Sequence, residues 1–154
     1  MRYVAVQQND FDIGEEAGRL RDIGTNVGAV CTFSGMVREF QQDAGDEQVN
    51  ELFLEHYPGM TEKSLTEIVD QAFERWPLAG CRVIHRVGAL QPGDQIVFVG
   101  TASEHRQAAF ESAEFIMDFL KTRAPFWKRQ TGSSGSEWVE HRDSDEQAAE
   151  RWQN

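Results

Sequence analysis

Apolar positions recur with helical spacing in two stretches of the chain. The segment after Pro58 and Gly59 carries apolar side chains at positions 65, 68, 69, 72, 73 and 76, the spacing of an amphipathic helix, and Pro77 ends it. A longer stripe predicts a helix over 104–123, capped by Ser103 and ended before Pro125. We expect a shorter helix over 12–23.

Short apolar runs bounded by turn residues predict the strands. Residues 27–37 and 49–57 flank a polar loop at 41–48, so we expect them to pair as a hairpin with a mobile tip. Residues 81–88 and 95–102, joined through a Gln-Pro-Gly-Asp turn, are expected to be central strands.

The two ends of the chain complete the pattern. A short strand is expected at 2–6 and another at 136–142, after a flexible connector at 131–136. Ser144 and Gln147 have the spacing of a capping box for a last helix that runs through Trp152.

The order of these elements alternates hairpins with helical crossovers. It predicts one α+β domain over 1–154, with a mixed, mostly antiparallel sheet and helices packed on it. The glycines form neither G-x-G-x-x-G after a strand nor a Walker A loop, so a doubly wound nucleotide-binding fold is not expected.

The net negative charge of the chain argues against anionic binding partners. The chain has 26 acidic residues against 15 Lys and Arg and a net charge of -11, so its average field repels nucleic acid and anionic lipid. Neither a signal peptide nor an apolar run long enough for a membrane span is present in the sequence, and we expect a soluble cytoplasmic protein. Cys31 and Cys81 lie in apolar strand-like runs and are expected to be buried, unpaired thiols.

One segment departs from this acidic background. Residues 121–130, KTRAPFWKRQ, contain four cations and no acid. Lys121 is explained by the last turn of a helix, where a cation is favoured, but Lys128 and Arg129 follow Pro125 and have no such explanation. We expect Phe126 and Trp127 to anchor the segment, which is either a local anion site or a solvated basic patch.

Other cations are candidates for the same anion. Arg38 follows an apolar strand, and His105 and Arg106 lie in the first turn of the long helix, where the helix dipole disfavours positive charge. His105 and Lys121 are 16 positions apart, or about 24 Å along a straight helix. Both can serve one small ligand only if the second comes from another copy of the chain, which predicts a site shared across a homodimer.

Other chemistry finds little support in the sequence. His56 and His85 lack metal-ligand spacing and are expected to be structural, and there is no zinc, EF-hand or serine-hydrolase motif. We therefore expect no metal and no cofactor.

Four segments together resemble one known family. LEHYPGMTEKSL, VIHRVGALQPGDQIVFVG, EHRQAAFESAEFIMDFLKTRAPFWKR and WVEHRDSDEQAAERW are similar to the large, catalytic subunit of molybdopterin synthase, in register from about Val27 to Trp152. The resemblance implies an α/β hammerhead-like fold and a sulfur transferase of molybdenum cofactor biosynthesis. It also implies a central homodimer in a heterotetramer, with a small ubiquitin-like sulfur-carrier subunit at each end. The carrier's C-terminal Gly-Gly thiocarboxylate would supply the sulfur that converts cyclic pyranopterin monophosphate to molybdopterin.

The resemblance also assigns site residues. Lys121 and Lys128 would be catalytic. From the charges of the two reactants we hypothesise that Lys121 acts at the thiocarboxylate, that Lys128, with its pKa lowered by the neighbouring Arg129, acts in proton transfer, and that Arg38 and Arg106 hold the phosphate. The full set that would line the substrate site is Met36, Val37, Arg38, His105, Arg106, Lys121, Lys128, Arg129, Gln130 and, from across the dimer, Arg142.

The sequence departs from the family at two of these positions. Met36 stands where a lysine is common and Gln130 where an acid is frequent, so one phosphate contact is lost or made by the backbone. Neither departure removes a motif lysine, and activity is expected.

Two rival interpretations stay open at this stage. A non-catalytic module that captures a phosphorylated metabolite or a carboxylate tail would tolerate Lys121→Arg, whereas a catalytic amine would not. A binder of single-stranded RNA would use Trp127, Phe126 and the cations, although the net charge opposes it.

Overall fold

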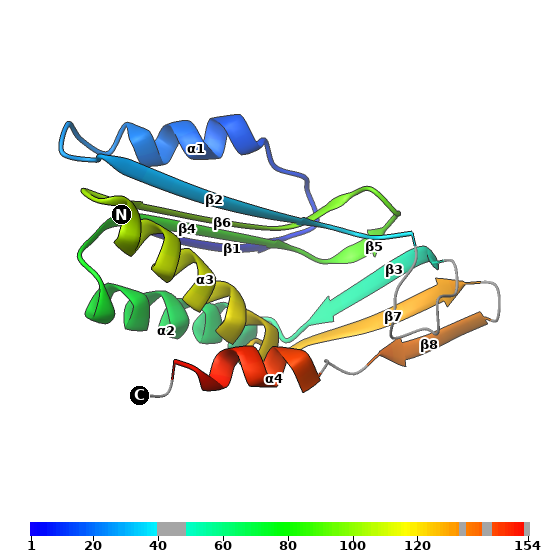
Figure 1. Cartoon of the computed structure of the whole chain (residues 1–154). Coiled ribbons are helices and arrows are strands. Elements are labelled where there is room, and N and C mark those ends of the chain that lie inside the picture. Colours follow the sequence, from blue (N-terminus) through cyan, green and yellow to red (C-terminus); the bar gives the residue numbers. More distant parts are fainter. Residues whose placement is uncertain (40–48, 133–134, 140–142, 153–154) are drawn as a thin grey trace.

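The fold is described from a computed structural model of the chain, which describes residues 1–39, 49–132, 135–139 and 143–152. Two four-stranded sheets lie side by side (Figure 1), the first in the order β1-β4-β6-β2 and the second in the order β5-β3-β7-β8. The strands are β1 (Arg2–Gln7), β2 (Ala29–Met36), β3 (Val49–His56), β4 (Leu78–Arg86), β5 (Gly88–Leu90), β6 (Gln95–Ser103), β7 (Phe126–Gly132) and β8 (Gly135–Val139). The helices are α1 (Ile13–Arg21), α2 (Met60–Arg75), α3 (Arg106–Arg123) and α4 (Asp143–Glu150).

The first sheet is covered on both faces. The helix α1 lies on one face and α2 and α3 lie on the other, with α4 beside the end of α3 (Figure 1). Gly100 lets α1 approach closely, because a Cβ built on it would lie 2.5 Å from Leu20 Cδ1. The largest apolar cluster fills the space between the sheet and the pair α2 and α3, and it includes Leu65, Val83, Val99 and Ile116.

Strand pairing confirms the predicted α+β class. Only β1 and β4 pair in parallel among the described strands, and the other pairs are antiparallel. The strands β4 and β6 are central, as predicted, but the connection between them carries the additional strand β5 before the Gln91–Asp94 turn. Gly93 adopts φ +93 in that turn, a conformation that favours glycine.

The predicted hairpin between 27–37 and 49–57 is wrong. The strand β2 pairs with β6 in the first sheet, whereas β3 pairs with β5 and β7 in the second. The predicted loop 41–48 lies outside the described residues. Both partners of β3 come from segments later in the chain. After β4 the chain leaves the first sheet and forms β5 in the second sheet, beside β3.

The C-terminal third also differs from the prediction. Residues 126–132 form β7, which the sequence pattern did not identify as a strand, and the expected connector at 131–136 contains the end of β7 and the start of β8. The last helix begins at Asp143, so Ser144 lies inside its first turn and is not the N-cap.

The start of the long helix α3 is also shifted. Its N-cap is His105, without a capping hydrogen bond from the side chain. Ser103 is not the cap, because its Oγ donates a hydrogen bond to the carbonyl oxygen of Pro77 at 2.9 Å. Ser103 therefore ties the end of β6 to the start of β4.

Both cysteines are unpaired, as predicted. Cys31 on β2 and Cys81 on β4 are each opposite Thr101 of β6, which separates them by two strand spacings, about 10 Å. A disulfide requires their Cα atoms to be closer than about 7 Å. Cys81 is fully buried, and burial raises its pKa to about 12.

Candidate active site

The helix α3 carries two of the predicted cationic groups at opposite ends. His105 and Arg106 lie at its N-terminus and Lys121 lies in its last turn, and all three side chains are exposed. The unbroken helix keeps His105 and Lys121 about 24 Å apart. A single chain therefore cannot bring these two groups to one small ligand.

The strand β7 places Lys128 and Arg129 on opposite faces of the second sheet. Successive side chains of a strand alternate, and Lys128 is opposite the buried Leu54 of β3, while Arg129 is opposite Phe53. The guanidinium of Arg129 lies 5.2 Å from the centre of the Phe53 ring. Lys128 thus lies on the side of the core, and the pleat separates its ammonium from the Arg129 guanidinium.

The two aromatic residues before Lys128, Phe126 and Trp127, also point to opposite faces of the sheet. Phe126 packs into the apolar clusters, as expected, and its ring stacks on the His85 ring with centroids 3.8 Å apart. Trp127 is 44% exposed and packs against Tyr57 on the other face, with centroids 5.4 Å apart. Of the two aromatic residues, Phe126 is the one that anchors the basic segment in the core.

Thr61 fixes the entry to β7. Its buried Oγ1 donates a hydrogen bond to the carbonyl oxygen of Pro125 at 3.0 Å and accepts one from the backbone N–H of Tyr57 at 2.9 Å. The start of α2 is thereby tied to the residue that precedes Phe126. Lys128 is held on a strand with a fixed beginning, which is what positioning a reactive amine requires.

The buried side chain of His85 is affected by the charges of both lysines. It is 7% exposed, and burial together with the charges of Lys121, Lys128 and His56 lowers its pKa to about 3. Lys121 from α3 and Lys128 from β7 are therefore both close enough to act on one imidazole. The sequence placed His85 among structural histidines, and the only signal for more was a histidine inside the buried run VIHR.

The segment Met36 to Arg38 lies at the end of β2. Met36 is opposite Gln95 at an irregularity of the β2–β6 pair, at the end of β6 that is remote from Ser103. Met36 is 53% exposed and Arg38 is exposed, so both side chains are accessible to a ligand.

Val37 has a structural position in this segment. It is 4% exposed in the apolar cluster of the second sheet. Its N–H donates a hydrogen bond to Asp94 O at 2.9 Å, and its carbonyl accepts one from Gly93 N–H at 2.8 Å. Val37 thus supports the turn beside Arg38.

Two predicted residues are described in part or not at all. The backbone of Gln130 lies in β7 opposite Leu52, and its side chain is outside the described part of the structure. Arg142 lies outside the described residues.

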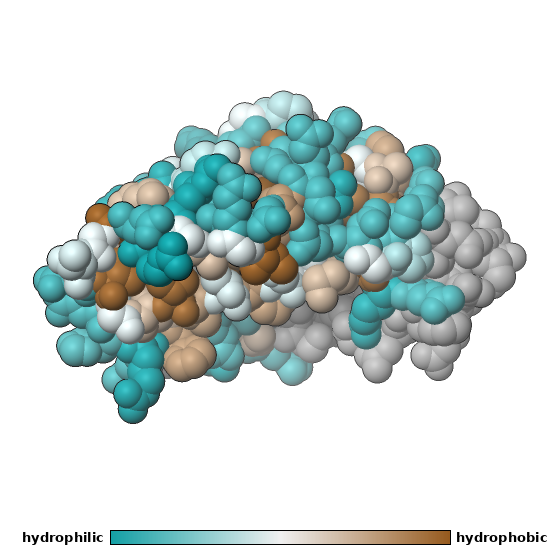
Figure 2. All heavy atoms as spheres, turned by 90° about the horizontal axis from the view of Figure 1, so that it is seen from above, coloured by the Kyte–Doolittle hydropathy of each residue, from teal (hydrophilic) through white to brown (hydrophobic). Residues whose placement is uncertain are grey.

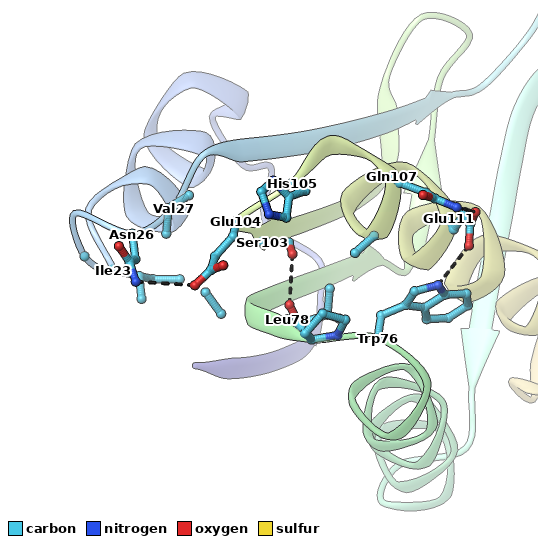
Figure 3. A pocket seen from close by; sticks show the side chains of 14 residues that line it. Ile23, Asn26, Val27, Trp76, Leu78, Ser103, Glu104, His105, Gln107 and Glu111 are labelled. Carbon is cyan, nitrogen blue, oxygen red and sulfur yellow. Dashed lines mark hydrogen bonds between the residues drawn. The ribbon is translucent and has the colours of Figure 1, made fainter.

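A pocket of about 670 Å³ lies at the N-terminal end of α3 (Figure 3). His105 lines it together with Glu104 and Glu111. Glu111 accepts hydrogen bonds from Gln107 at 3.0 Å and from the indole N–H of Trp76 at 2.9 Å, and these bonds lower its pKa. Two carboxylates disfavour an anion here, so within one chain this pocket is not the phosphate site.

Metal and membrane chemistry find no support in the described residues. They contain no group of three or more His, Cys, Asp or Glu side chains arranged to hold a metal ion. None of the helices in this part of the chain is long and apolar enough to cross a membrane. The face seen in Figure 2 is covered mainly by hydrophilic side chains, with apolar ones visible between them.

Comparison with known proteins decides the family. The model of a family described as "MoaE protein" matches residues 6–123. The chain belongs to the MoaE family. It is 57% identical over 150 residues to the molybdopterin synthase catalytic subunit of Vibrio cholerae and 57% identical over 149 residues to that of Escherichia coli. Both alignments cover 97% of this chain and 97% of the relative, so MoaE similarity extends over nearly the whole sequence.

Solved structures agree with this assignment. The molybdopterin biosynthesis MoaE protein of Burkholderia ambifaria superposes with a TM-score of 0.84 at 45% identity, covering 99% of this chain and 98% of that one. A chain from a complex of subunits 1 and 2 of the Helicobacter pylori molybdopterin-converting factor superposes with a TM-score of 0.69, covering 86% of this chain and 87% of that one. At 20% identity, this second structure shows a shared fold.

Membership of the MoaE family confirms the resemblance seen in the sequence. It also confirms the predicted enzyme class, the catalytic subunit of molybdopterin synthase in molybdenum cofactor biosynthesis. The assignment of individual site residues stays a prediction.

Proposed function

We propose that this chain transfers sulfur from the C-terminal thiocarboxylate of a small ubiquitin-like carrier subunit to cyclic pyranopterin monophosphate. The observation that supports this most directly is that Lys121 and Lys128 both act electrostatically on the buried His85 ring, since two cations in one region suit two anionic reactants. The carrier is proposed by analogy with the two-subunit complex of the Helicobacter pylori protein. The cytoplasm is the proposed location.

The proposed roles follow from where negative charge develops. The thiocarboxylate sulfur attacks a side-chain carbon of the pterin and displaces an oxygen substituent, which leaves as water or as an oxygen of the phosphate ester, so that a thioester joins the carrier to the pterin. Lys121 stabilises the thiocarboxylate and then the oxyanion that forms when water attacks the carbonyl carbon of this thioester. That attack leaves the sulfur on the pterin and releases the carrier with an ordinary carboxylate. Lys128 moves the proton that this step requires. Two rounds deliver the two sulfurs of the dithiolene.

The phosphate is held by arginines in this proposal. Arg38 binds it with a planar fork of N–H donors, and Arg106 and His105 reach it from the second protomer of a homodimer. Met36, Val37, Arg129, Gln130 and Arg142 complete the proposed lining. In the single chain Arg129 contacts Phe53 and Val37 is buried, so Val37 would act through the turn that it supports.

Reconstitution tests the proposal. The purified chain, mixed with a thiocarboxylated carrier and the cyclic pterin, is expected to form the dithiolene product. Lys121→Ala should reduce kcat by about 10²- to 10³-fold, the cost of removing a group that stabilises an oxyanion. Its affinity for the carrier, measured by calorimetry, should be unchanged.

Lys121→Arg is the matched control, because it keeps the charge and changes the donor geometry. Loss of activity in this variant supports a catalytic amine. Full activity would show that a positive charge at this position suffices and that the amine itself is not needed, and product formation at the normal rate by Lys121→Ala would refute the role of Lys121.

A further inference from the structure

His85 is a buried imidazole at the junction of the two sheets, and the proposed reaction assigns it no step. It lies on β4, is 7% exposed and stacks on Phe126, the first residue of β7, at an interplanar angle of 20°. The stack holds the ring in one plane beside the strand that carries Lys128. The position of both ring nitrogens is therefore fixed.

One hydrogen bond determines the tautomer. Nδ1 lies 2.8 Å from the carbonyl oxygen of Arg86, and a carbonyl only accepts, so Nδ1 carries the hydrogen. Burial, and then the charges of Lys121, Lys128 and His56, lower the pKa to about 3 and keep the ring neutral. Nε2 therefore holds a lone pair and can only accept.

This acceptor has no protein donor in the described part of the chain. The titratable groups that act on the ring are His56 from β3, Lys121 from α3 and Lys128 from β7. The ammonium groups of the two lysines can donate a hydrogen bond but cannot accept one. The imidazole of His56 faces a carboxylate instead, with its Nε2 4.0 Å from Glu62 Oε2. A buried acceptor without a donor is unfavourable, which points to a donor of this site that turns toward Nε2 when the site is in use.

Lys121 is the better candidate of the two lysines. It lies in the last turn of α3, five positions before Phe126, whose ring stacks on the imidazole, and no carboxylate among the described residues pairs with it. Its side chain is exposed at the end of α3, and four methylene groups allow the ammonium to turn toward the ring.

We propose that His85 is a positioning residue, whose Nε2 accepts a hydrogen bond from the Lys121 ammonium when the site is loaded. A carboxylate could orient the amine as well, but it would cancel the positive charge that an anionic reactant needs. A neutral imidazole orients the ammonium and leaves its charge intact. This inference rests on the proposed function of Lys121.

Two variants of His85 distinguish the role of the Nε2 acceptor from a structural role of the side chain. Asparagine places an amide near Nδ1, so His85→Asn keeps the hydrogen bond to Arg86 and removes the acceptor at Nε2. Glutamine places its amide near Nε2, so His85→Gln restores an acceptor there. Both are assayed as the full complex with thiocarboxylated carrier and cyclic pterin, with Tm and carrier affinity measured in parallel.

The expected result is a loss in one variant and rescue in the other. kcat falls about tenfold in His85→Asn, because a hydrogen bond to a charged group is lost, and His85→Gln recovers most of it. The alkaline limb of the kcat profile moves to lower pH in His85→Asn, because removing an acceptor makes the ammonium easier to deprotonate.

The outcomes also separate this inference from the proposed function. If the wild-type complex forms dithiolene and both variants keep its kcat and pH profile, the positioning role is overturned. Equal losses in both variants with a parallel fall in Tm overturn it too, since they indicate a structural histidine. If the wild-type complex forms no dithiolene, the proposed function itself fails.

Discussion

At the scale of single residues, Arg38 is an exposed cation next to Val37, whose backbone bonds to Gly93 and Asp94 in the turn before β6. If it holds the substrate phosphate, Arg38→Ala should raise KM for the cyclic pterin about tenfold, since hydrogen bonds to charged groups contribute roughly 1.5–3 kcal/mol. Arg21→Ala is the control, because Arg21 is 75% exposed at the end of α1. An unchanged KM in Arg38→Ala would argue against a phosphate contact.

His85 also makes stability depend on pH. Its folded pKa of about 3 lies below the ordinary value of 6.5, so between these values the unfolded chain binds more protons than the folded one. The free energy of unfolding should therefore fall as the pH drops from about 6.5 toward 3, by at most about 1.4 kcal/mol per pH unit from this group. Urea unfolding of wild type and His85→Asn at pH 4, 5 and 7 measures it, and parallel curves would contradict the prediction.

At the scale of elements, Thr61 joins α2 to the start of β7. Thr61→Val keeps the shape but leaves the Pro125 carbonyl and the Tyr57 N–H without their partner, which should cost about 1–3 kcal/mol of stability and lower kcat by loosening the strand of Lys128. Thr66→Val is the matched control on the same helix. Its hydroxyl is exposed and, among the described residues, bonds only to Glu62 O, so a change below about 0.5 kcal/mol is expected. Equal losses in denaturant unfolding would contradict the assigned link.

The elements also show what the sequence could predict. The local pattern of apolar residues correctly predicted α2, α3, β4 and β6. Each of these elements has one buried face or is buried on both faces, which leaves a clear apolar pattern in the sequence. The pairing of β3 with β7 could not be found in this way, because the paired residues are 70 or more positions apart in the chain and no local signal encodes that pairing.

Two site features were hidden for the same kind of reason. The strand β7 carries Lys128 on one face and Arg129 on the other, which conceals the apolar alternation that identifies strands. His85 looked structural because its role depends on Lys121 and Lys128, which come from two other elements. The motif residues themselves were accessible to sequence reasoning because Lys121 and Lys128 lie in one short run.

At the scale of the whole molecule, α3 keeps His105 and Arg106 far from Lys121, so the proposed site needs two protomers. Mixing a Lys121→Ala chain with an Arg106→Ala chain tests this. Random exchange makes half of the dimers hybrid, and one of the two sites in each hybrid has both residues intact, so activity should return to about a quarter of wild type. Each variant alone should retain no more than about a tenth of the wild-type activity at pterin concentrations below KM. A mixture no more active than its components would show that one protomer supplies both groups.

The two thiols on the strands that flank β6 have a practical consequence for such experiments. Cys81 is fully buried and Cys31 is partly so, and burial raises the pKa of both, so maleimide reagents should modify the native chain slowly. A single cysteine introduced at an exposed position can then carry a spin label or fluorophore without first removing the natural thiols. Spectroscopic ruler measurements between two subunits are thus feasible in an otherwise unaltered sequence.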